Sequence, residues 1–149
     1  MRFQFIRKAS FWRQTMMAGA TAFAVTASVP TAAEVTVGVI LSLTGPAASL
    51  GQPAENTVKL WPKEIGGEQA RVIIMNDGSD PTEAGRLASK LITEENVDVL
   101  VGSSITPPSI SIMEVAGRNE TPLVSLGGGN AIIEPQEGSR TWAFKIPAP

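Results

Sequence analysis

The alternation of apolar and polar positions divides the chain into strand-like and helix-like segments. Four short runs are nearly continuously apolar and rich in β-branched residues, which is the pattern of strands covered on both faces. They lie at residues 35–41, 70–75, 97–101 and 122–126, and residues 142–146 alternate as a last extended segment. Segments with helical spacing separate these runs. This order predicts right-handed βαβ units, and therefore an α/β fold with a mostly parallel sheet and helices on both faces.

The clearest helix follows the second strand. Asp80 is an N-cap candidate, Pro81 stands at the first helical position, and Glu83 lies three residues after the cap, as in a capping box. Apolar residues then recur at positions 84, 87, 88, 91 and 92, which puts them on one helix face. A later helix is expected to begin at Pro107-Pro108 and to end near residues 118–119, and a short helical turn is expected around residues 132–135.

The first helix is less regular. Apolar residues recur at helical spacing between residues 54 and 65, and Gly66-Gly67 would stop a helix there. Pro62 interrupts this pattern, because proline lacks the backbone N–H and clashes with the preceding turn. We therefore expect a kink or a break near residues 60–61.

Polar residues and glycines follow the strands at the points where the strands end. In an open α/β sheet, ligands bind in the crevice beyond the carboxyl ends of the strands. Hydroxyl groups beside a helix N-terminus suit a small carboxylate, because both supply hydrogen-bond donors and the helix dipole favours negative charge. The alternative for Ser104 or Thr106 is that it caps the helix that follows. The residues expected at this edge are Ser42 to Gly45, Asn76, Asp77, Ser103, Ser104, Thr106, and Ser125 to Gly128.

The composition excludes several kinds of chemistry. The 149 residues include no cysteine and no histidine, so the chain has no disulfide, no thiol nucleophile and no histidine base to activate a serine. The glycines match neither a dinucleotide-binding motif nor a phosphate-binding loop, so no cofactor is predicted. Asn76, Asp77 and Asp80 lack further acidic ligands, and turn and cap roles are expected for them instead of metal binding. Low aromatic content and the lack of a basic stripe disfavour nucleic acid as a partner.

The first 33 residues differ from the rest. Four basic residues precede an Ala-rich apolar stretch, and small residues at 31–33 offer a cleavage site, as in a secretory signal peptide. A membrane anchor is the alternative, but the apolar stretch is shorter than the roughly 20 residues that span a bilayer. Removal of residues 1–33 leaves 8 of the 12 basic residues and all 14 acidic ones, a formal charge of −6. We expect a soluble exported protein with one domain at residues 34–149, truncated at its C-terminal end.

Six motifs, in their order and spacing, resemble the solute-binding proteins of branched-chain amino acid ABC transporters, the leucine-binding family with the type 1 periplasmic-binding fold. The motifs are L-S-L-T-G-P-A-A-S-L-G (41–51), P-K-E-I-G-G (62–67), N-D-G-S-D-P-T-E-A (76–84), V-D-V-L-V-G-S-S-I-T-P-P-S (97–109), T-P-L-V-S-L-G-G-G-N-A-I (121–132) and R-T-W-A-F-K-I-P (140–147). In that family two α/β lobes close on a ligand like a hinge. The resemblance implies a periplasmic protein without enzymatic activity, which delivers a small-molecule ligand to a membrane permease.

The resemblance also implies roles for individual residues. Ser103 and Ser104 take the hydroxyl role after the third strand, Gly127 and Gly128 supply backbone contacts, and Leu50 touches the ligand side chain. Ser125, at the end of the fourth strand, belongs to the same edge.

The ligand stays open at this stage. Amino acid binders of the family tend to carry a threonine where this chain has Gly129, which removes one group expected to hold the zwitterion. The motif at 140–147 is similar to a subgroup associated with aromatic acids and related carboxylates. Two other functions remain as alternatives: a ligand-sensing domain of a receptor or regulator, and an enzyme whose catalytic base lies outside these residues.

Overall fold

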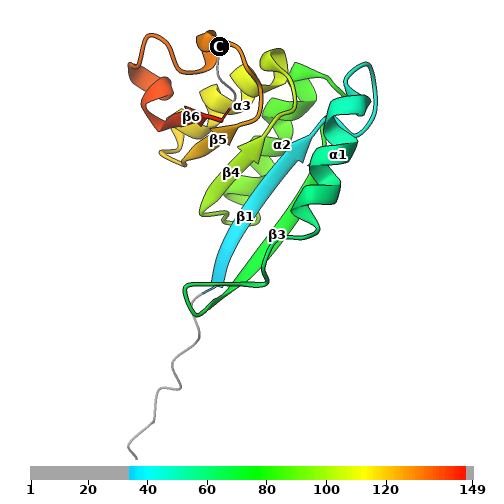
Figure 1. Cartoon of the computed structure of the whole chain (residues 1–149). Helices are drawn as coiled ribbons and strands as arrows, with labels where there is room; N and C mark the ends of the chain where they lie inside the picture. Colours follow the sequence, from blue (N-terminus) through cyan, green and yellow to red (C-terminus); the bar gives the residue numbers. More distant parts are fainter. Residues whose placement is uncertain (1–33, 147–149) are drawn as a thin grey trace, which may run out of the picture. The chain divides into compact units, whose positions relative to one another are not determined.

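A computed structural model describes residues 34–146 (Figure 1). The strands are β1 (Glu34–Leu41), β2 (Glu64–Ile65), β3 (Glu68–Asn76), β4 (Val99–Gly102), β5 (Leu123–Ser125) and β6 (Ala143–Lys145). The helices are α1 (Ala48–Val58), α2 (Pro81–Thr93) and α3 (Thr106–Arg118), and two short 3-10 helices follow, η1 (Asn130–Ile132) and η2 (Gly138–Trp142). None of the helices within residues 34–146 has the length and apolar character needed to cross a membrane.

The six strands form one sheet in the order β2-β3-β1-β4-β5-β6. All neighbouring strands are parallel except β2 and β3, which form an antiparallel hairpin. From β1 the chain moves to β3 on one side, then crosses to β4 on the other side and continues to β5 and β6. This confirms the predicted α/β fold with a mostly parallel sheet. The strand order reverses between β1 and β4, which is where open α/β sheets bind their ligands.

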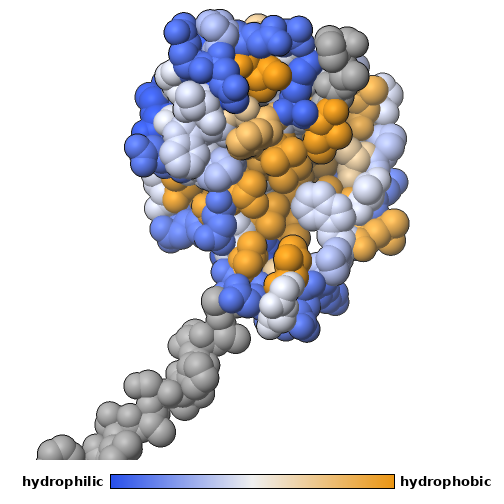
Figure 2. Space-filling model, turned by 60° about the vertical axis from the view of Figure 1, so that its left-hand side comes forward, coloured by the Kyte–Doolittle hydropathy of each residue, from blue (hydrophilic) through white to orange (hydrophobic). Residues whose placement is uncertain are grey.

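Helices cover both faces of the sheet, as predicted, but unequally. α2 and α3 pack on one face, where Ile40, Leu100 and Leu123 are fully buried (Figure 1). The other face carries α1, whose Val58 joins the buried side chains of β1. Apolar residues of β3 and β4 beyond the reach of α1 stay partly exposed, and Figure 2 shows a continuous apolar area on one face of the molecule.

The first helix differs from its expected bounds. α1 begins at residue 48, contains Pro53 and ends at Val58, before the break expected near residues 60–61. The expectation that helix continues toward residue 65 is wrong, because Glu64–Ile65 pairs with the start of β3 as a strand. Gly66 and Gly67 have φ angles of 64° and 91°, which glycine adopts readily, so they form a hairpin turn and not a helix stop.

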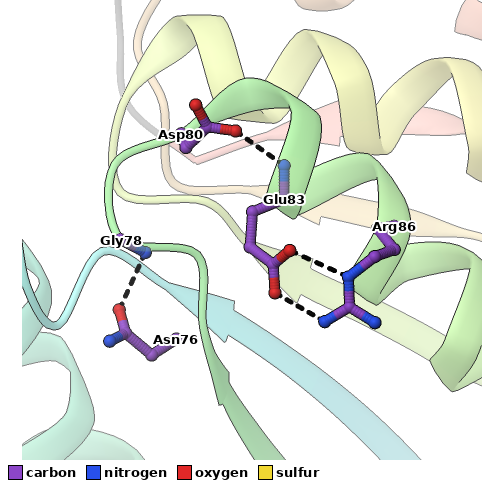
Figure 3. Close-up of polar contacts among 5 residues, drawn as sticks. All are labelled: Asn76, Gly78, Asp80, Glu83 and Arg86. Atoms are coloured by element: carbon purple, nitrogen blue, oxygen red, sulfur yellow. Dashed lines mark hydrogen bonds and ion pairs between the residues drawn. The ribbon is translucent and has the colours of Figure 1, made fainter.

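α2 and α3 begin close to where the sequence predicts. The backbone N–H of Glu83 donates to Asp80 Oδ1 over 2.7 Å, which confirms Asp80 as the N-cap of α2. The second half of the capping box does not form, because the Glu83 carboxylate pairs with Arg86 instead (Figure 3). α3 starts at Thr106, directly before the two prolines.

Candidate ligand-binding site

The carboxyl ends of the parallel strands bring the expected hydroxyl residues to one edge of the sheet, which we call the rim. Ser42 directly follows β1, Ser103 follows β4, and Ser125 ends β5. β4 pairs with β1 on one side and with β5 on the other, so the three serines sit at neighbouring strand ends. α1 and α3 begin at the rim as well, on opposite faces of the sheet (Figure 1).

These three serines lie beneath the surface of the rim, because each has a relative exposure of 0%. Ser103 Oγ donates a hydrogen bond to Asp77 Oδ2 and lies 3.3 Å from Ser42 Oγ. A serine hydroxyl has one proton, and Ser103 gives its proton to Asp77, so Ser42 must be the donor to Ser103. In this arrangement Ser103 has no proton left to donate to a ligand. Its contact with a ligand stays a prediction.

Asp77 holds a second turn at the rim. Its other oxygen, Oδ1, accepts a hydrogen bond from the Ser79 N–H over 2.8 Å. Ser79 Oγ donates to the carbonyl of Thr44 over 2.9 Å and accepts the N–H of Ala47 over 3.1 Å. The sequence indicates a turn at Asn76-Asp77-Gly78, but it gives no sign that the Asp77 carboxylate is fully buried.

The outer hydroxyls of the rim belong to Ser104 and Thr106, which are both partly exposed. Ser104 Oγ accepts the N–H of Ser42 over 3.3 Å, and Thr106 Oγ1 accepts the N–H of Gly129 over 3.0 Å. Neither hydroxyl donates a hydrogen bond to another residue of the described chain. Each can therefore donate its proton outward.

The start of α3 has no side-chain cap among residues 34–146, and its N-cap residue is Ile105. The alternative that Ser104 or Thr106 caps this helix is therefore wrong. Ser104 lies one residue before the N-cap and Thr106 is the first residue of the helix, and their side chains bond to other loops instead. The N–H groups of Ser104, Ile105 and Thr106 donate to no acceptor in the described residues. The two prolines that follow carry no N–H, so these three groups make up the donor set of this turn.

The glycine-rich loop after β5 lies against the start of α3. A Cβ atom on Gly127 would come within 2.7 Å of Ser109 Oγ, so only glycine fits this close approach. A Cβ atom on Gly129 would lie 2.4 Å from Thr106 Cγ2. Thr106 thus fills the space that a side chain at position 129 would occupy, and its hydroxyl group lies there.

Gly128 is exposed at the tip of this loop, and its carbonyl accepts a hydrogen bond from Lys145 Nζ over 3.0 Å. Lys145 Nζ also donates to Asn130 Oδ1 over 2.6 Å. Lys145 therefore braces the loop and brings a positive charge close to the rim. The sequence places Lys145 only in a motif, and its role depends on the pairing of β6 with β5.

Leu50 lies in the first turn of α1 and is 57% exposed. The next residue, Gly51, packs directly on the end of β1, because a Cβ atom there would lie 2.1 Å from the carbonyl oxygen of Ser42. The close packing brings the start of α1 against the rim. Leu50 is therefore an exposed apolar residue in the helix turn that packs on the end of β1.

The turn after β3 is closed by its own side chains (Figure 3). Asn76 Oδ1 accepts the N–H of Gly78 over 2.9 Å, and Asp80 caps α2, so the expected turn and cap roles are confirmed. The hydrogen bond from Arg86 lowers the pKa of Glu83. Across residues 34–146, no three acidic side chains gather in a way that could hold a metal ion.

Comparison with known proteins identifies the family. The sequence model of the family described as periplasmic binding protein matches residues 34–144. The chain belongs to the periplasmic binding protein family. Leu/Ile/Val-binding protein homolog 6 of Brucella abortus is 27% identical over 116 residues, which cover 74% of this chain and 30% of that protein.

Two solved structures of proteins from Rhodopseudomonas palustris are similar in fold. An extracellular ligand-binding receptor of strain HaA2 is 43% identical with a TM-score of 0.74, over 76% of this chain and 32% of that chain. A solute binding protein of an ABC transporter of strain BisB5, in complex with 3,4-dihydroxybenzoic acid, is 27% identical with a TM-score of 0.69, over 75% and 31%. The fold is that of type 1 periplasmic binding proteins, and the chain spans about a third of the length of these relatives.

Proposed function

We propose that this protein captures a small carboxylate-bearing solute outside the cytoplasm and delivers it to the membrane permease of an ABC importer, without catalysing a reaction. The observation that carries this proposal is the set of free donors at the point where the strand order reverses. Within residues 34–146, Ser104 and Thr106 keep a hydroxyl proton each, and α3 begins there without a side-chain cap. Donors of this kind bind an anion. The set includes no base that could activate a nucleophile.

The proposed ligand-binding residues form two layers. Ser104, Gly128 and Leu50 are at least partly exposed and stand where a ligand can reach them. Ser103, Ser125 and Gly127 lie directly beneath, and we propose that they shape the floor of the site. The predicted signal peptide at residues 1–33 lies outside the described residues. Export through such a signal supports a periplasmic location.

The balance of donors and acceptors favours a simple carboxylate, such as a hydroxylated benzoate, over an amino acid. An α-ammonium group needs an acceptor, preferably a carboxylate. The acids nearest the rim are already used, since Asp77 is bonded to Ser103 and Ser79, and Asp80 caps α2. The relative in complex with 3,4-dihydroxybenzoic acid supports this choice. A branched-chain amino acid is the second candidate, supported by the name of the Brucella relative.

The test uses a protein that contains both lobes, as relatives of about three times this length do. It compares alanine substitutions at two serines. Ser104→Ala removes a hydrogen bond to a charged group, so we expect a loss of about 1.5–3 kcal/mol in binding free energy. Calorimetric titration with 3,4-dihydroxybenzoic acid and with leucine measures it. Ser89→Ala on the exposed side of α2 is the matched control and should leave the affinity unchanged.

Two results would count against this proposal. Equal affinities of the Ser104 variant and the unchanged protein would remove Ser104 from the site. Failure of both compounds to bind at millimolar concentration would contradict capture of these carboxylates. A sensor of the same ligand, the alternative function, would bind equally well, and a signalling domain encoded after residue 149 would identify it.

A further inference from the structure

Asp77 is a buried acidic residue to which the proposed function assigns no role. Its relative exposure is 0%, and within residues 34–146 no lysine or arginine forms an ion pair with it. Burial of a carboxylate costs free energy unless hydrogen bonds replace its lost water. Its hydrogen-bond partners should therefore show what it does.

We propose that Asp77 is a positioning residue for the ligand rim, where it orients the donors of two neighbouring turns without touching the ligand. The effect on affinity rests on the proposed function. The hydrogen-bond arrangement itself can be tested without any ligand.

The first branch leads from Asp77 Oδ2 to Ser104. Ser103 donates to Asp77, and Ser42 donates to Ser103 in turn. The backbone N–H of Ser42 then donates to Ser104 Oγ over 3.3 Å. Because this bond occupies an acceptor position on Ser104, the proton of Ser104 is left for an outward partner. A carboxylate at the inner end thus fixes the direction in which the Ser103 and Ser42 hydroxyls donate, and the backbone N–H of Ser42 holds Ser104 Oγ in place.

The second branch leads from Asp77 Oδ1 to the start of α1. Ser79 donates its N–H to Asp77, and its hydroxyl joins the carbonyl of Thr44 to the N–H of Ala47. Ala47 is the N-cap residue of α1, which carries the exposed Leu50 in its first turn. The two oxygens of the Asp77 carboxylate are therefore linked to the starts of both α1 and α3, beside the point where the strand order reverses.

The direction of donation has a consequence for the ligand. An acceptor-only group at position 77 draws the Ser103 proton inward, so a ligand carboxylate must take its hydrogen bonds from the outer layer. An amide at position 77 can donate a hydrogen bond where Oδ2 of Asp77 accepts one. This would reverse the direction of donation between residue 77 and Ser103. The amide N–H would donate to Ser103 Oγ, and the proton of Ser103 would turn toward Ser42.

Asp77→Asn tests the proposal, because the new side chain has nearly the same shape. In the unchanged protein, the buried hydroxyl proton of Ser103 should exchange slowly with water and give a resolved NMR signal. We expect the variant to lose or strongly shift that signal and to shift the amide resonances of Ser104 and Ala47. Affinity for 3,4-dihydroxybenzoic acid or leucine, whichever binds, should fall about tenfold. Asp80→Asn is the matched control, since asparagine also caps helices well, and it should change none of these readings.

The outcomes separate this proposal from the proposed function. An unchanged Ser103 signal in the Asp77→Asn variant, or unshifted Ser104 and Ala47 amides, would overturn the positioning role. An affinity that stays within twofold would also overturn it. If neither compound binds the unchanged protein, the proposed function fails, and the NMR readings still decide the role of Asp77. If the variant does not fold, Ser42→Ala tests the order of donation in the first branch: a shifted Ser103 signal supports donation from Ser42 to Ser103, and an unshifted one overturns it.

Discussion

The turns after β3 and β4 flank β1 at the same edge of the sheet, and both lead from a strand into a helix. They use similar residue types differently. After β3, Asn76 accepts the N–H of Gly78 in its own turn as well as the N–H groups of Leu43 and Thr44, and Asp80 caps the start of α2 (Figure 3). After β4, Ser104 and Thr106 bond to other loops, and α3 starts without a side-chain cap in the described chain.

This difference shows which part of the rim can accept a ligand. A helix start whose N–H groups are satisfied by its own side chains has few donors left for an anion. The turn after β4 keeps donors available, because Ser104 and Thr106 use their hydroxyl oxygens as acceptors for the N–H groups of neighbouring loops. A capped start thus serves stability, and we infer that the open start serves binding.

The largest effect should come from the backbone at the last residue of β4, where the open turn begins. Gly102 has a φ of 121°, and a Cβ atom there would lie 1.9 Å from the carbonyl oxygen of Ile40. Gly102→Ala therefore forces β4 away from β1, and we expect it to lower the free energy of unfolding by about 4 kcal/mol or more, or to prevent folding. Denaturant unfolding followed by circular dichroism measures this loss.

The same substitution in α2 is the matched control. A Cβ atom on Gly85 would meet its nearest neighbour, Ser111 Cβ, at 3.6 Å, which is ordinary contact. Since alanine favours helix more than glycine does, Gly85→Ala should raise the free energy of unfolding by about 0.5–1 kcal/mol. Similar losses in the two variants would mean that the turn after β4 is no more constrained than the helix.

The fold was largely predictable from the sequence, because strands buried on both faces and an amphipathic, capped helix have strong local patterns. Asp80, Pro81 and Glu83 mark the start of α2 by local chemistry alone. The error at residues 64–65 has a tertiary cause. Ile65 fits the spacing of a helix, but Gly66-Gly67 bends the chain back so that Glu64–Ile65 pairs with β3.

The candidate site was predictable only in outline. The rule that parallel strands end at one edge correctly grouped Ser42, Ser103 and Ser125. Burial and hydrogen-bond direction depend on how loops from distant parts of the sequence pack, and no local pattern encodes them. Hence the sequence indicates only a turn role for Asp77, and it does not decide whether Ser104 caps a helix or binds a ligand.

A moderate effect is expected at the closed turn. Asp80→Ala removes the side-chain oxygen that accepts the N–H of Glu83, and loss of such a cap lowers the free energy of unfolding by about 1 kcal/mol. Ligand affinity should not change, because Asp80 bonds to the N–H of Glu83 at the start of α2 and not to a proposed ligand-binding residue. A thermal melt together with a titration of 3,4-dihydroxybenzoic acid measures both quantities. The loss of stability can explain part of a fall in affinity. A larger fall would show that the closed turn also takes part in binding.

The smallest effect concerns the exposed pair of Glu83, in the first turn of α2, and Arg86, three residues later. The hydrogen bond from Arg86 lowers the pKa of Glu83 from its ordinary value of 4.5, so folding favours the charged form. The contribution of the pair to stability is thus present above pH 4.5 and is lost as the pH falls through the lower folded-state pKa. Glu83→Gln removes this contribution, so its melting temperature should lie slightly below that of the unchanged protein at about pH 7 and match it at about pH 2. Because the pair is exposed, about 1 M salt should also narrow the difference at neutral pH. A difference that persists in acid would assign the effect to helix propensity or packing and not to the charge of Glu83.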